Sequence, residues 1–314
     1  MVAVVVTHNR ISELRTTLDS LMVSLPHYLS AIVVFDNASK DGTEEYLAAL
    51  KAENPLTDVI RSEKNLGGAG GFELGMRHAV SAYDPDWIVV MDDDGRPEPD
   101  ALAVFHSQDR SIAHGWGAAT YHPDGRICEM NRPSINPFWD RSAMLRSLSG
   151  RGRAGFHINS ACYDGDAYVP VDGVSFVGFF ISRSGIERAG YPDGDLFIYG
   201  DDVLYTLGLR SKGGTSLFDP NIRFEHNYST NSVSDQRFRP LWKTYYHYRN
   251  LLMVYRLCSG WWFGLVFPIV AAKWFFKVRF HSGQRLHFLK LLCLAIWHAL
   301  ISRTSVSHDT VLKW

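Results

Sequence analysis

Three consecutive carboxylates, Asp92, Asp93 and Asp94, are the residues of this 314-residue chain whose type and spacing most directly indicate chemistry. Adjacent carboxylates repel one another, so such a cluster is stable mainly where a cation neutralises it. Oxygen ligands suit Mg²⁺ or Mn²⁺, and residues two apart on an extended segment point the same way, so Asp92 and Asp94 can flank one ion. A solvated acidic turn is the alternative, but the apolar run before the triplet favours the metal site.

A second carboxylate pair, Asp201 and Asp202, follows the sequence Phe197-Ile198-Tyr199-Gly200. A carboxylate is a side chain that can deprotonate a hydroxyl nucleophile. Acidic residues are also favourable at the start of any helix, because they complement its dipole. From these residues alone, catalysis and simple helix stabilisation remain equally open.

His226 and the glycine-rich stretch 65–71 are weaker signals. A lone histidine is usually a core or surface residue, yet the neutral imidazole of His226 could complete the metal coordination sphere. The stretch 65–71 is predicted to be a loop, followed by a helix to about Ser81. Its glycines, Gly67 and Gly68 among them, let backbone amides approach a ligand closely. The alternative for this stretch is a flexible turn that opens a helix.

The elements that must position these residues alternate between strands and helices. Buried strands are predicted over 2–6, 31–35, 59–60 and 87–91, and Ser12 is the expected N-cap of the first helix. This alternation predicts an α/β fold, Rossmann-like, with a mostly parallel sheet and helices on both faces. Ligands bind beyond the carboxyl ends of such strands. Four polar loops are therefore expected at one rim, those of Thr7, Asp36, Asn65 and the acidic triplet.

The composition limits the class of protein. Apolar residues make up 46% of the chain, and 32 basic residues nearly balance 33 acidic ones, so a nucleic-acid binder is not expected. The four cysteines lie far apart, which suggests neither a zinc cluster nor a disulfide framework. No basic segment precedes the first strand, so no signal peptide is expected, and a reduced, cytosol-facing protein is predicted.

Five short motifs together resemble glycosyltransferase family 2, which has the GT-A fold: Thr7 to Arg10, Asp36 to Ser39, Asn65 to Gly68, Asp92 to Asp94 and Gly200 to Asp202. The resemblance covers roughly residues 3–250. Within the family, residues 65–72 (NLGGAGGF) are similar to bacterial galactofuranosyltransferases of mycobacterial arabinogalactan synthesis. Residues 245–250 (YYHYRN) resemble a stretch shared with rhamnosyltransferases. Gly200 departs from the pattern, because the polymerising galactofuranosyltransferases have tryptophan there.

The resemblance implies which residues bind the nucleotide sugar. Thr7 and Arg10 would contact uridine diphosphate, Asp36 and Asn65 would hold uracil and ribose, and Asp93 would lie near the sugar. The full implied set is Thr7, Arg10, Asp36, Asn65, Gly67, Gly68 and Asp93.

The resemblance also implies the metal ligands and the catalytic pair. Asp92, Asp94 and His226 would bind Mn²⁺ or Mg²⁺. Asp202 would be the base that deprotonates the acceptor, and Asp201 would orient acceptor hydroxyls. The implied enzyme is an inverting, metal-dependent hexosyltransferase. It moves galactofuranose from UDP-galactofuranose to a lipid-linked or cell-envelope glycan acceptor.

Three alternatives stay open. One is a rhamnosyltransferase that uses dTDP-rhamnose, which the 245–250 stretch fits equally well. A second is a catalytically silent subunit that only binds a nucleotide sugar. A third is a nucleotidyltransferase, for which Arg10 alone offers little of the basic pyrophosphate loop required.

The expected domains are a catalytic domain over 1–240 and a helical region over 241–314. The nucleotide-sugar half of the first would cover about 1–120 and the acceptor half about 121–240. The uncharged stretch 257–272 is short for a membrane span and contains Pro268, Trp261 and Trp262. With 287–301, it is predicted to form amphipathic helices that lie on the cytoplasmic face of a bacterial inner membrane, as a peripheral protein. Core helices or a homo-oligomer interface are the alternative.

Overall fold

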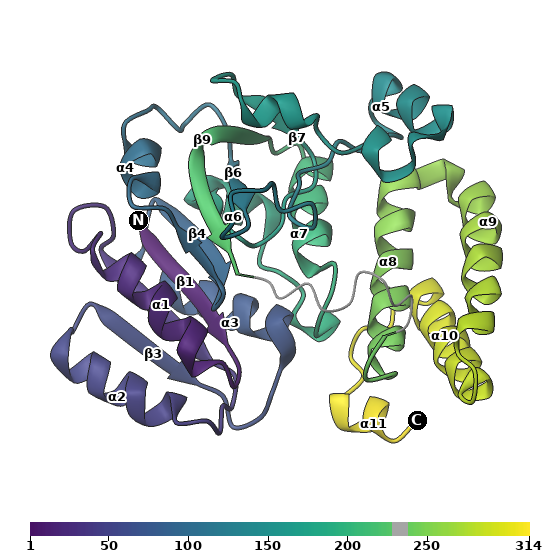
Figure 1. The fold of residues 1–314 in the computed structure, drawn as a ribbon, viewed down its shortest axis with the longest axis horizontal. Helices are drawn as coiled ribbons and strands as arrows, with labels where there is room; N and C mark the ends of the chain where they lie inside the picture. The colour runs from purple at the N-terminus through teal and green to yellow at the C-terminus, as the bar shows by residue number, and fades with distance from the viewer. Residues whose placement is uncertain (228–237) are drawn as a thin grey trace.

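The computed structural model describes residues 1–227 and 238–314, as an α/β body followed by a helical region (Figure 1). In the described residues, nine strands form one sheet, in the order β3-β2-β1-β4-β8-β6-β9-β5, with β7 paired to β9. Their bounds are β1 Val2–Thr7, β2 Ala31–Asp36, β3 Thr57–Arg61, β4 Trp87–Asp92, β5 Gly95–Pro97, β6 Gly115–Tyr121, β7 Val169–Val171, β8 Phe179–Ser182 and β9 Ser216–His226.

The sheet is parallel in its N-terminal half and mixed beyond it. β1 pairs in parallel with β2 and β4, and β2 with β3. β8 runs antiparallel to both β4 and β6, and β5 runs antiparallel to β9. The α/β prediction is confirmed, while the parallel arrangement within residues 1–227 and 238–314 is limited to the four N-terminal strands and the β6–β9 pair. Two parallel neighbouring strands must be joined by a crossover connection. β8 instead follows a long, largely irregular segment, and it joins the sheet in the antiparallel direction.

Helices cover both faces of the sheet, as predicted. α1 (Ile11–Met22) and α2 (Thr43–Glu53) pack on one face, and α3 (Gly67–Tyr83) and α6 (Arg183–Ala189) pack on the other. Neighbouring residues of β1 point to opposite faces, so Val4 belongs to the core under α3 and Val5 to the core under α1. The body also contains α4 (Ala101–His106), α5 (Arg141–Arg146) and α7 (Asp201–Ser211).

Two predicted helix starts need correction. α1 begins at Ile11 rather than behind an N-cap at Ser12, because the Asp41 carboxylate accepts a hydrogen bond from the Ile11 N–H at 3.0 Å. The glycine-rich stretch is not a loop, since α3 already begins at Gly67. A Cβ at Gly71 would lie 2.5 Å from Cγ1 of Val6 on β1, so this glycine allows α3 to pack closely on the sheet.

The C-terminal helices surround a further hydrophobic core, to which Phe197 of the α/β body also contributes. The C-terminal region contains α8 (Lys243–Ser259), α9 (Phe263–Phe275), α10 (Arg285–Leu300) and α11 (His308–Leu312). α8 lies between the α/β body and the hairpin of α9 and α10 (Figure 1). The apolar stretch 257–272 is not one helix, because the chain turns at Gly260, where φ is +49°, and folds back as α9. The expected domain boundary at 240 lies between the end of β9 and the start of α8.

Candidate active site

Strand register brings the polar loops of β1, β2 and β4 to one rim. Thr7 pairs with Asp36, and Val6 pairs with Asp92, so the carboxyl ends of these three strands are level. Asn65 follows β3 on the same edge. The convergence predicted from the strand pattern is therefore present in the structure.

Arg10 lies against the acidic triplet. Its guanidinium forms ion pairs with Oδ1 of Asp93 at 3.1 Å and with Oδ2 of Asp94 at 2.8 Å. Thr7 donates its hydroxyl to Oδ2 of Asp93 at 2.8 Å. Burial raises the pKa of Asp93 to about 6, although Arg10 and Thr7 act in the opposite direction. In this arrangement Thr7 and Arg10, both expected at the diphosphate, are engaged with the carboxylates.

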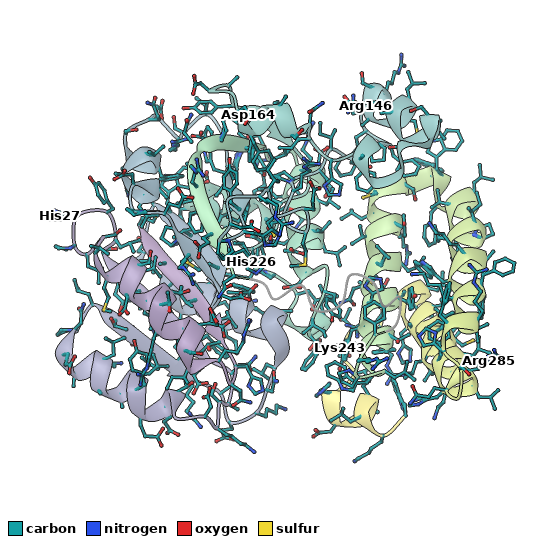
Figure 2. The ribbon with its side chains drawn as sticks, in the orientation of Figure 1. His27, Arg146, Asp164, His226, Lys243 and Arg285 are labelled. Atoms are coloured by element: carbon teal, nitrogen blue, oxygen red, sulfur yellow. The ribbon has the colours of Figure 1, made fainter. Side chains whose placement is uncertain are left out.

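His226 joins the triplet through strand pairing. The antiparallel β5–β9 pair places His226 opposite Gly95, next to Asp94. His226 Nε2 lies 3.3 Å from Oδ1 of Asp94, and its Nδ1 lies 2.7 Å from Oδ1 of Asn131. Burial alone would lower the pKa of His226, but the hydrogen bonds and charges of Asp94 and Cys128 raise it to about 10. His226 lies near the middle of the molecule (Figure 2).

Asn131 is a site residue that the sequence did not reveal. The amide oxygen is an acceptor, so the Nδ1 of His226 that faces it carries a proton, and Nε2 is left to face Asp94. This contact fixes the ring orientation in the way that outer-shell groups fix metal-binding histidines. Nothing in the local sequence of Asn131 signals the contact, because 95 residues separate the partners.

Asp201 and Asp202 begin α7, directly after Gly200, which adopts a left-handed conformation with φ +76°. Oδ1 of Asp202 accepts the N–H of Val203 at 2.7 Å. Burial, followed by the neighbouring Asp202 charge, raises the pKa of Asp201. Burial and the Asp94 charge raise the pKa of Asp92, and the charge of Asp201 contributes in the same direction. The two acidic clusters therefore act on one another across the site.

The two side chains expected to contact the nucleoside, those of Asp36 and Asn65, bind other groups of the protein in this structure. Asp36 accepts the N–H of Ser39 at 2.9 Å with Oδ1 and pairs with Arg61 at 2.6 Å through Oδ2. Asn65 Oδ1 accepts the N–H of Gly67 at 2.7 Å. The sequence analysis did not identify Arg61 as a site residue. Arg61 is the last residue of β3 and lies at the same rim, so the rule that ligands bind at the carboxyl ends of strands would have identified it.

Asn37 is a second missed residue at this rim. Its Oδ1 accepts the N–H of Leu66 at 2.7 Å, and its Nδ2 donates to the carbonyl of Gly67 at 2.8 Å. The two glycines differ in their surroundings. A Cβ at Gly67 would lie 2.1 Å from the carbonyl oxygen of Phe197, whereas one at Gly68 would meet open space. Gly67 therefore permits a close backbone contact, and Gly68 is the one that a ligand could approach.

The side chains present are of the types that bind a divalent cation. They are not arranged around a common point where an ion would lie. Among the described residues, no three histidine, cysteine or acidic side chains are grouped closely enough to hold an ion. Within the same part of the chain, the Asp92 carboxylate has no hydrogen bond or ion pair, while Asp94 is shared between Arg10 and His226. Carboxylate oxygens and an imidazole with its Nε2 directed at them are suitable Mn²⁺ or Mg²⁺ ligands. In this structure the Arg10 guanidinium supplies, next to Asp93 and Asp94, the positive charge that a bound ion would supply.

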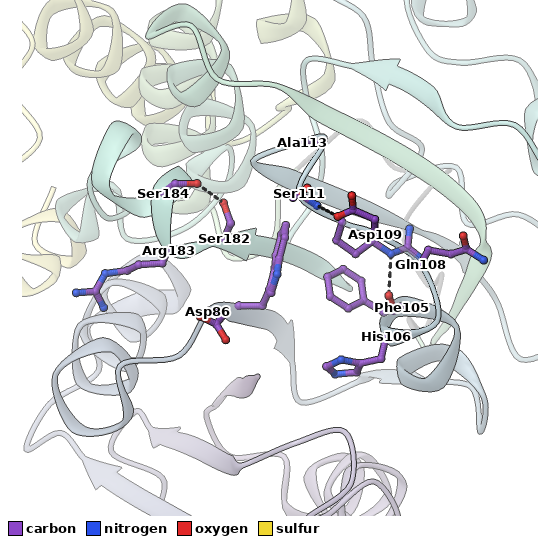
Figure 3. A pocket seen from close by; sticks show the side chains of 12 residues that line it. Asp86, Phe105, His106, Gln108, Asp109, Ser111, Ala113, Ser182, Arg183 and Ser184 are labelled. Atoms are coloured by element: carbon purple, nitrogen blue, oxygen red, sulfur yellow. Dashed lines mark hydrogen bonds between the residues drawn. The ribbon is translucent and has the colours of Figure 1, made fainter.

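A cavity of about 470 Å³ lies away from these residues (Figure 3). It is lined among others by Asp86, Phe105 and Ser182, at the start of β4. Asp92 is at the other end of that strand, about 16 Å away for a strand of this length. The cavity is therefore not part of the candidate active site.

Comparison with known proteins finds similarity in sequence and in fold. Residues 2–107 match the family described as glycosyl transferase family 2. Galactofuranosyltransferase GlfT1 of Mycolicibacterium smegmatis is 35% identical over 202 residues, which is 64% of this chain and 62% of GlfT1. The chain thus spans about three fifths of the length of the curated relatives it matches.

Two solved structures are similar in fold. GalNAc-T7 with UDP, GalNAc and Mn²⁺ gives a TM-score of 0.57 at 19% identity, over 81% of this chain and 47% of that chain. The mannosyltransferase PcManGT from Pyrobaculum calidifontis, in complex with GDP-Man and Mn²⁺, gives 0.55 at 15% identity, over 97% of this chain and 86% of that one. The expected GT-A fold is confirmed.

Proposed function

We propose that this chain, whose residues 2–107 carry a glycosyl transferase family 2 domain, is an inverting, metal-dependent galactofuranosyltransferase. The observation that carries the proposal is the arrangement of two carboxylate clusters at the carboxyl rim of the sheet. The triplet ends β4, the pair begins α7, and the charge of Asp201 raises the pKa of Asp92. A transferase needs such a pair of sites, one for the leaving diphosphate and one for the acceptor base.

In the proposed reaction, Asp202 takes the proton of the acceptor hydroxyl as its oxygen attacks the anomeric carbon. The new C–O bond forms as the bond to the diphosphate breaks, so UDP leaves from the opposite face and the configuration inverts. Asp201 orients the acceptor. Asp92, Asp94 and His226 would hold Mn²⁺ or Mg²⁺, which when bound neutralises charge on the diphosphate.

The donor assignment is supported by the likeness to the mycobacterial galactofuranosyltransferases, at 35% identity. Thr7 and Arg10 would bind the diphosphate, Asp36 and Asn65 the nucleoside, and Asp93 the sugar. Gly67 and Gly68 lie beside them at the start of α3. The acceptor would be a lipid-linked or cell-envelope glycan, as expected for an enzyme of this kind in a bacterium.

A panel of nucleotide sugars tests this proposal. UDP-galactofuranose, UDP-galactopyranose, dTDP-rhamnose and GDP-mannose are each offered with Mn²⁺, and nucleoside diphosphate release and transfer are measured with and without chelator. We expect turnover from UDP-galactofuranose that chelator abolishes. Turnover from dTDP-rhamnose alone would identify a rhamnosyltransferase instead. Nucleotide-sugar binding without any turnover would indicate a silent binding subunit.

The C-terminal helices support a peripheral membrane location. Trp261, Trp262, Ile269 and Phe276 are exposed on and beside α9. Among the described residues, the run Lys243–Phe280, which comprises α8, α9 and the short turns after each, is the one that is long and apolar enough to cross a membrane by length and composition, and 6% of its apolar window is buried. Because the run folds back at Gly260, we propose that it lies on the bilayer surface, at the cytoplasmic face.

The charges of the chain favour an anionic bilayer as the partner of this surface. Residues 239–314 contain 11 basic residues and one acidic residue, whereas residues 1–238 contain 21 basic and 32 acidic residues. Basic residues near a bilayer surface are attracted to anionic lipids, by about 1 kcal/mol each. The acidic body would be held away from the same surface.

Sedimentation with vesicles tests this location. The full chain is expected to pellet with phosphatidylglycerol-containing vesicles and less with phosphatidylcholine alone. The double substitution Trp261→Glu and Ile269→Glu is expected to release it, while Ile112→Glu, at an exposed site on the α/β body, is the matched control. A wild-type protein that stays in the supernatant and sediments as a dimer would show that this face is a homo-oligomer interface.

A further inference from the structure

The segment Asp195 to Gly200, which leads directly into the carboxylate pair, has an unfavourable backbone conformation. Phe197 has φ +68° and Tyr199 has φ +69°, both in the left-handed region, and Gly200 follows with φ +76°. Residues other than glycine avoid this region, so such a conformation persists only where surrounding groups hold it. The direction in which Asp201 and Asp202 leave the segment depends on these angles.

Asn250 of α8 binds three carbonyl groups of this segment. Its Nδ2 lies 3.1 Å from the carbonyl oxygen of Leu196, 2.9 Å from that of Ile198 and 2.8 Å from that of Tyr199. The side chain of Asn250 is fully buried. One amide group therefore holds both residues that flank the turn at Phe197, and the residue that precedes Gly200.

Arg249, the neighbour of Asn250, binds the segment and also orients the amide. It is fully buried, and its guanidinium donates to the carbonyls of Asp195 at 3.1 Å and Leu196 at 2.9 Å. Its Nε donates to Oδ1 of Asn250 at 2.8 Å, which turns the NH₂ group of that amide toward the segment. A buried guanidinium that contacts neutral carbonyls in place of a carboxylate is unusual, and here it serves to fix backbone.

The remaining carbonyl is held from the opposite side by the glycine-rich stretch. The N–H of Ala69 in the first turn of α3 donates to the carbonyl of Phe197 at 3.1 Å, and Gly67 leaves the space for this approach. Each carbonyl from Asp195 to Tyr199 thus accepts a hydrogen bond from α3 or α8. The sequences NLGGAGGF and YYHYRN, far apart in the chain, meet on the same segment.

We propose that Arg249 and Asn250 are positioning residues, which hold the strained segment Asp195 to Gly200 and thereby direct Asp201 and Asp202 toward the acceptor. The inference rests on the proposed role of that pair in sugar transfer. It gives a function to the YYHYRN stretch that the proposed binding of donor and metal does not use. Neither residue is expected to touch the donor or the acceptor.

The substitution Asn250→Asp tests the proposal, because it keeps the size of the side chain and removes its donors to the three carbonyls. Misplacement of a reacting group by about 1 Å can cost about 10²-fold in rate. We expect kcat to fall by about this factor, with UDP affinity in Mn²⁺ unchanged and the acidic limb of the kcat profile displaced. Arg249→Lys is the second variant, since lysine cannot reach both carbonyls and Asn250 together.

Tyr245→Phe is the matched control on the same helix. It removes a buried hydroxyl that pairs with His298 Nδ1 at 2.7 Å and accepts a long 3.4 Å bond from Arg249. The bonds of Arg249 and Asn250 to the segment, and the bond between these two residues, stay in place. The thermal stability of Tyr245→Phe is expected to fall while kcat and the pH profile stay as in the wild type. Equal loss of kcat in Tyr245→Phe and Asn250→Asp at equal loss of stability would overturn the positioning role.

Hydrogen exchange separates failure of this inference from failure of the proposed function. Amides of residues 197–203 are expected to exchange faster in Asn250→Asp than in Tyr245→Phe or the wild type. The exchange measurement does not require sugar transfer. A wild-type protein without activity would therefore contradict the proposed function, while the exchange rates would still test the positioning role. Unchanged exchange and unchanged kcat in folded Asn250→Asp would overturn it.

Discussion

Nε2 of His226 lies 3.3 Å from Oδ1 of Asp94, although 132 positions separate the two residues. The pairing of β5 with β9 explains the contact, because His226 stands opposite Gly95 and the N–H of Asn227 donates to the Asp94 carbonyl at 2.9 Å. Nε2, the imidazole nitrogen that faces the carboxylate, is the one that would ligate an ion. The contact therefore connects the proposed metal site to a fixed element of the sheet.

Substitution of Asn131 is expected to weaken the metal site. Asn131 holds Nδ1 of His226, and loss of such an outer-shell partner typically lowers metal affinity by about 10–100-fold. Asn131→Ala should therefore require more Mn²⁺ for half-maximal UDP binding, as measured by calorimetry across a metal titration.

The control for Asn131 is Ser175→Ala. The amide nitrogen of Asn131 donates to the Ser175 hydroxyl at 2.9 Å, so this variant removes the bond of the amide nitrogen and keeps the contacts of the amide oxygen with His226 and the Cys128 thiol. Its metal requirement should match the wild type. An Asn131→Ala protein with wild-type metal dependence would remove His226 from the proposed ligand set.

The rate of transfer should rise with pH through a range above that of an ordinary carboxylic acid. The proposed base must be ionised, and burial raises the pKa of Asp202 above that of an ordinary carboxylic acid. Since the charged form is the active one, kcat is low below this pKa and reaches a plateau above it. A pH profile of kcat in Mn²⁺ would show the acidic limb displaced upward from about pH 4, the ordinary value for a carboxylic acid, and a limb at the ordinary value would contradict the assignment.

Removal of the base should separate rate from donor binding. Asp202→Asn is expected to lower kcat by about 10²–10⁴-fold, the usual contribution of a general base. Because the proposed base is assigned to the acceptor and not to the nucleotide, the dissociation constant for UDP in Mn²⁺ should stay near the wild-type value. Asp201→Asn should mainly raise the KM for the acceptor. Near wild-type turnover in Asp202→Asn would assign the base elsewhere.

Gly67 should be intolerant of any side chain. Its φ is +73°, and a Cβ would lie 2.1 Å from the carbonyl oxygen of Phe197. The left-handed conformation alone costs about 1–2 kcal/mol per residue, and the backbone contact adds to it. Thermal unfolding of Gly67→Ala should show this loss. Gly208 lies inside α7, and a Cβ there would meet open space. Gly208→Ala is the matched control, and its free energy of unfolding should rise by about 0.5–1 kcal/mol.

Positions set by strand ends were predictable from the sequence. Thr7, Asp36 and Asp92 each follow an apolar run, and parallel strands bring their carboxyl ends together. The prediction of a loop over the glycine-rich stretch 65–71 was wrong, because its glycines allow α3 to pack closely on β1. A glycine pattern alone does not distinguish a ligand from a strand as the neighbour of the backbone.

Contacts between distant segments were not predictable. Asn131 and Asn250 act on His226 and on the segment before Asp201, across 95 and more than 50 residues of chain. The antiparallel entry of β8 and the break at Gly260 likewise depend on tertiary packing rather than on local pattern. Single asparagines carry no periodicity, so the sequence gives no signal for them before the fold is known.

The anomeric configuration of the product tests the account most directly. UDP-galactofuranose, a galactofuranoside acceptor and Mn²⁺ are incubated with the full chain, and the new linkage is read by nuclear magnetic resonance from the anomeric coupling constant and carbon shift. We predict a single galactofuranosyl linkage of configuration opposite to the donor, formed by direct displacement. A product that keeps the donor's configuration, or equal transfer with the metal removed, would contradict the proposed mechanism.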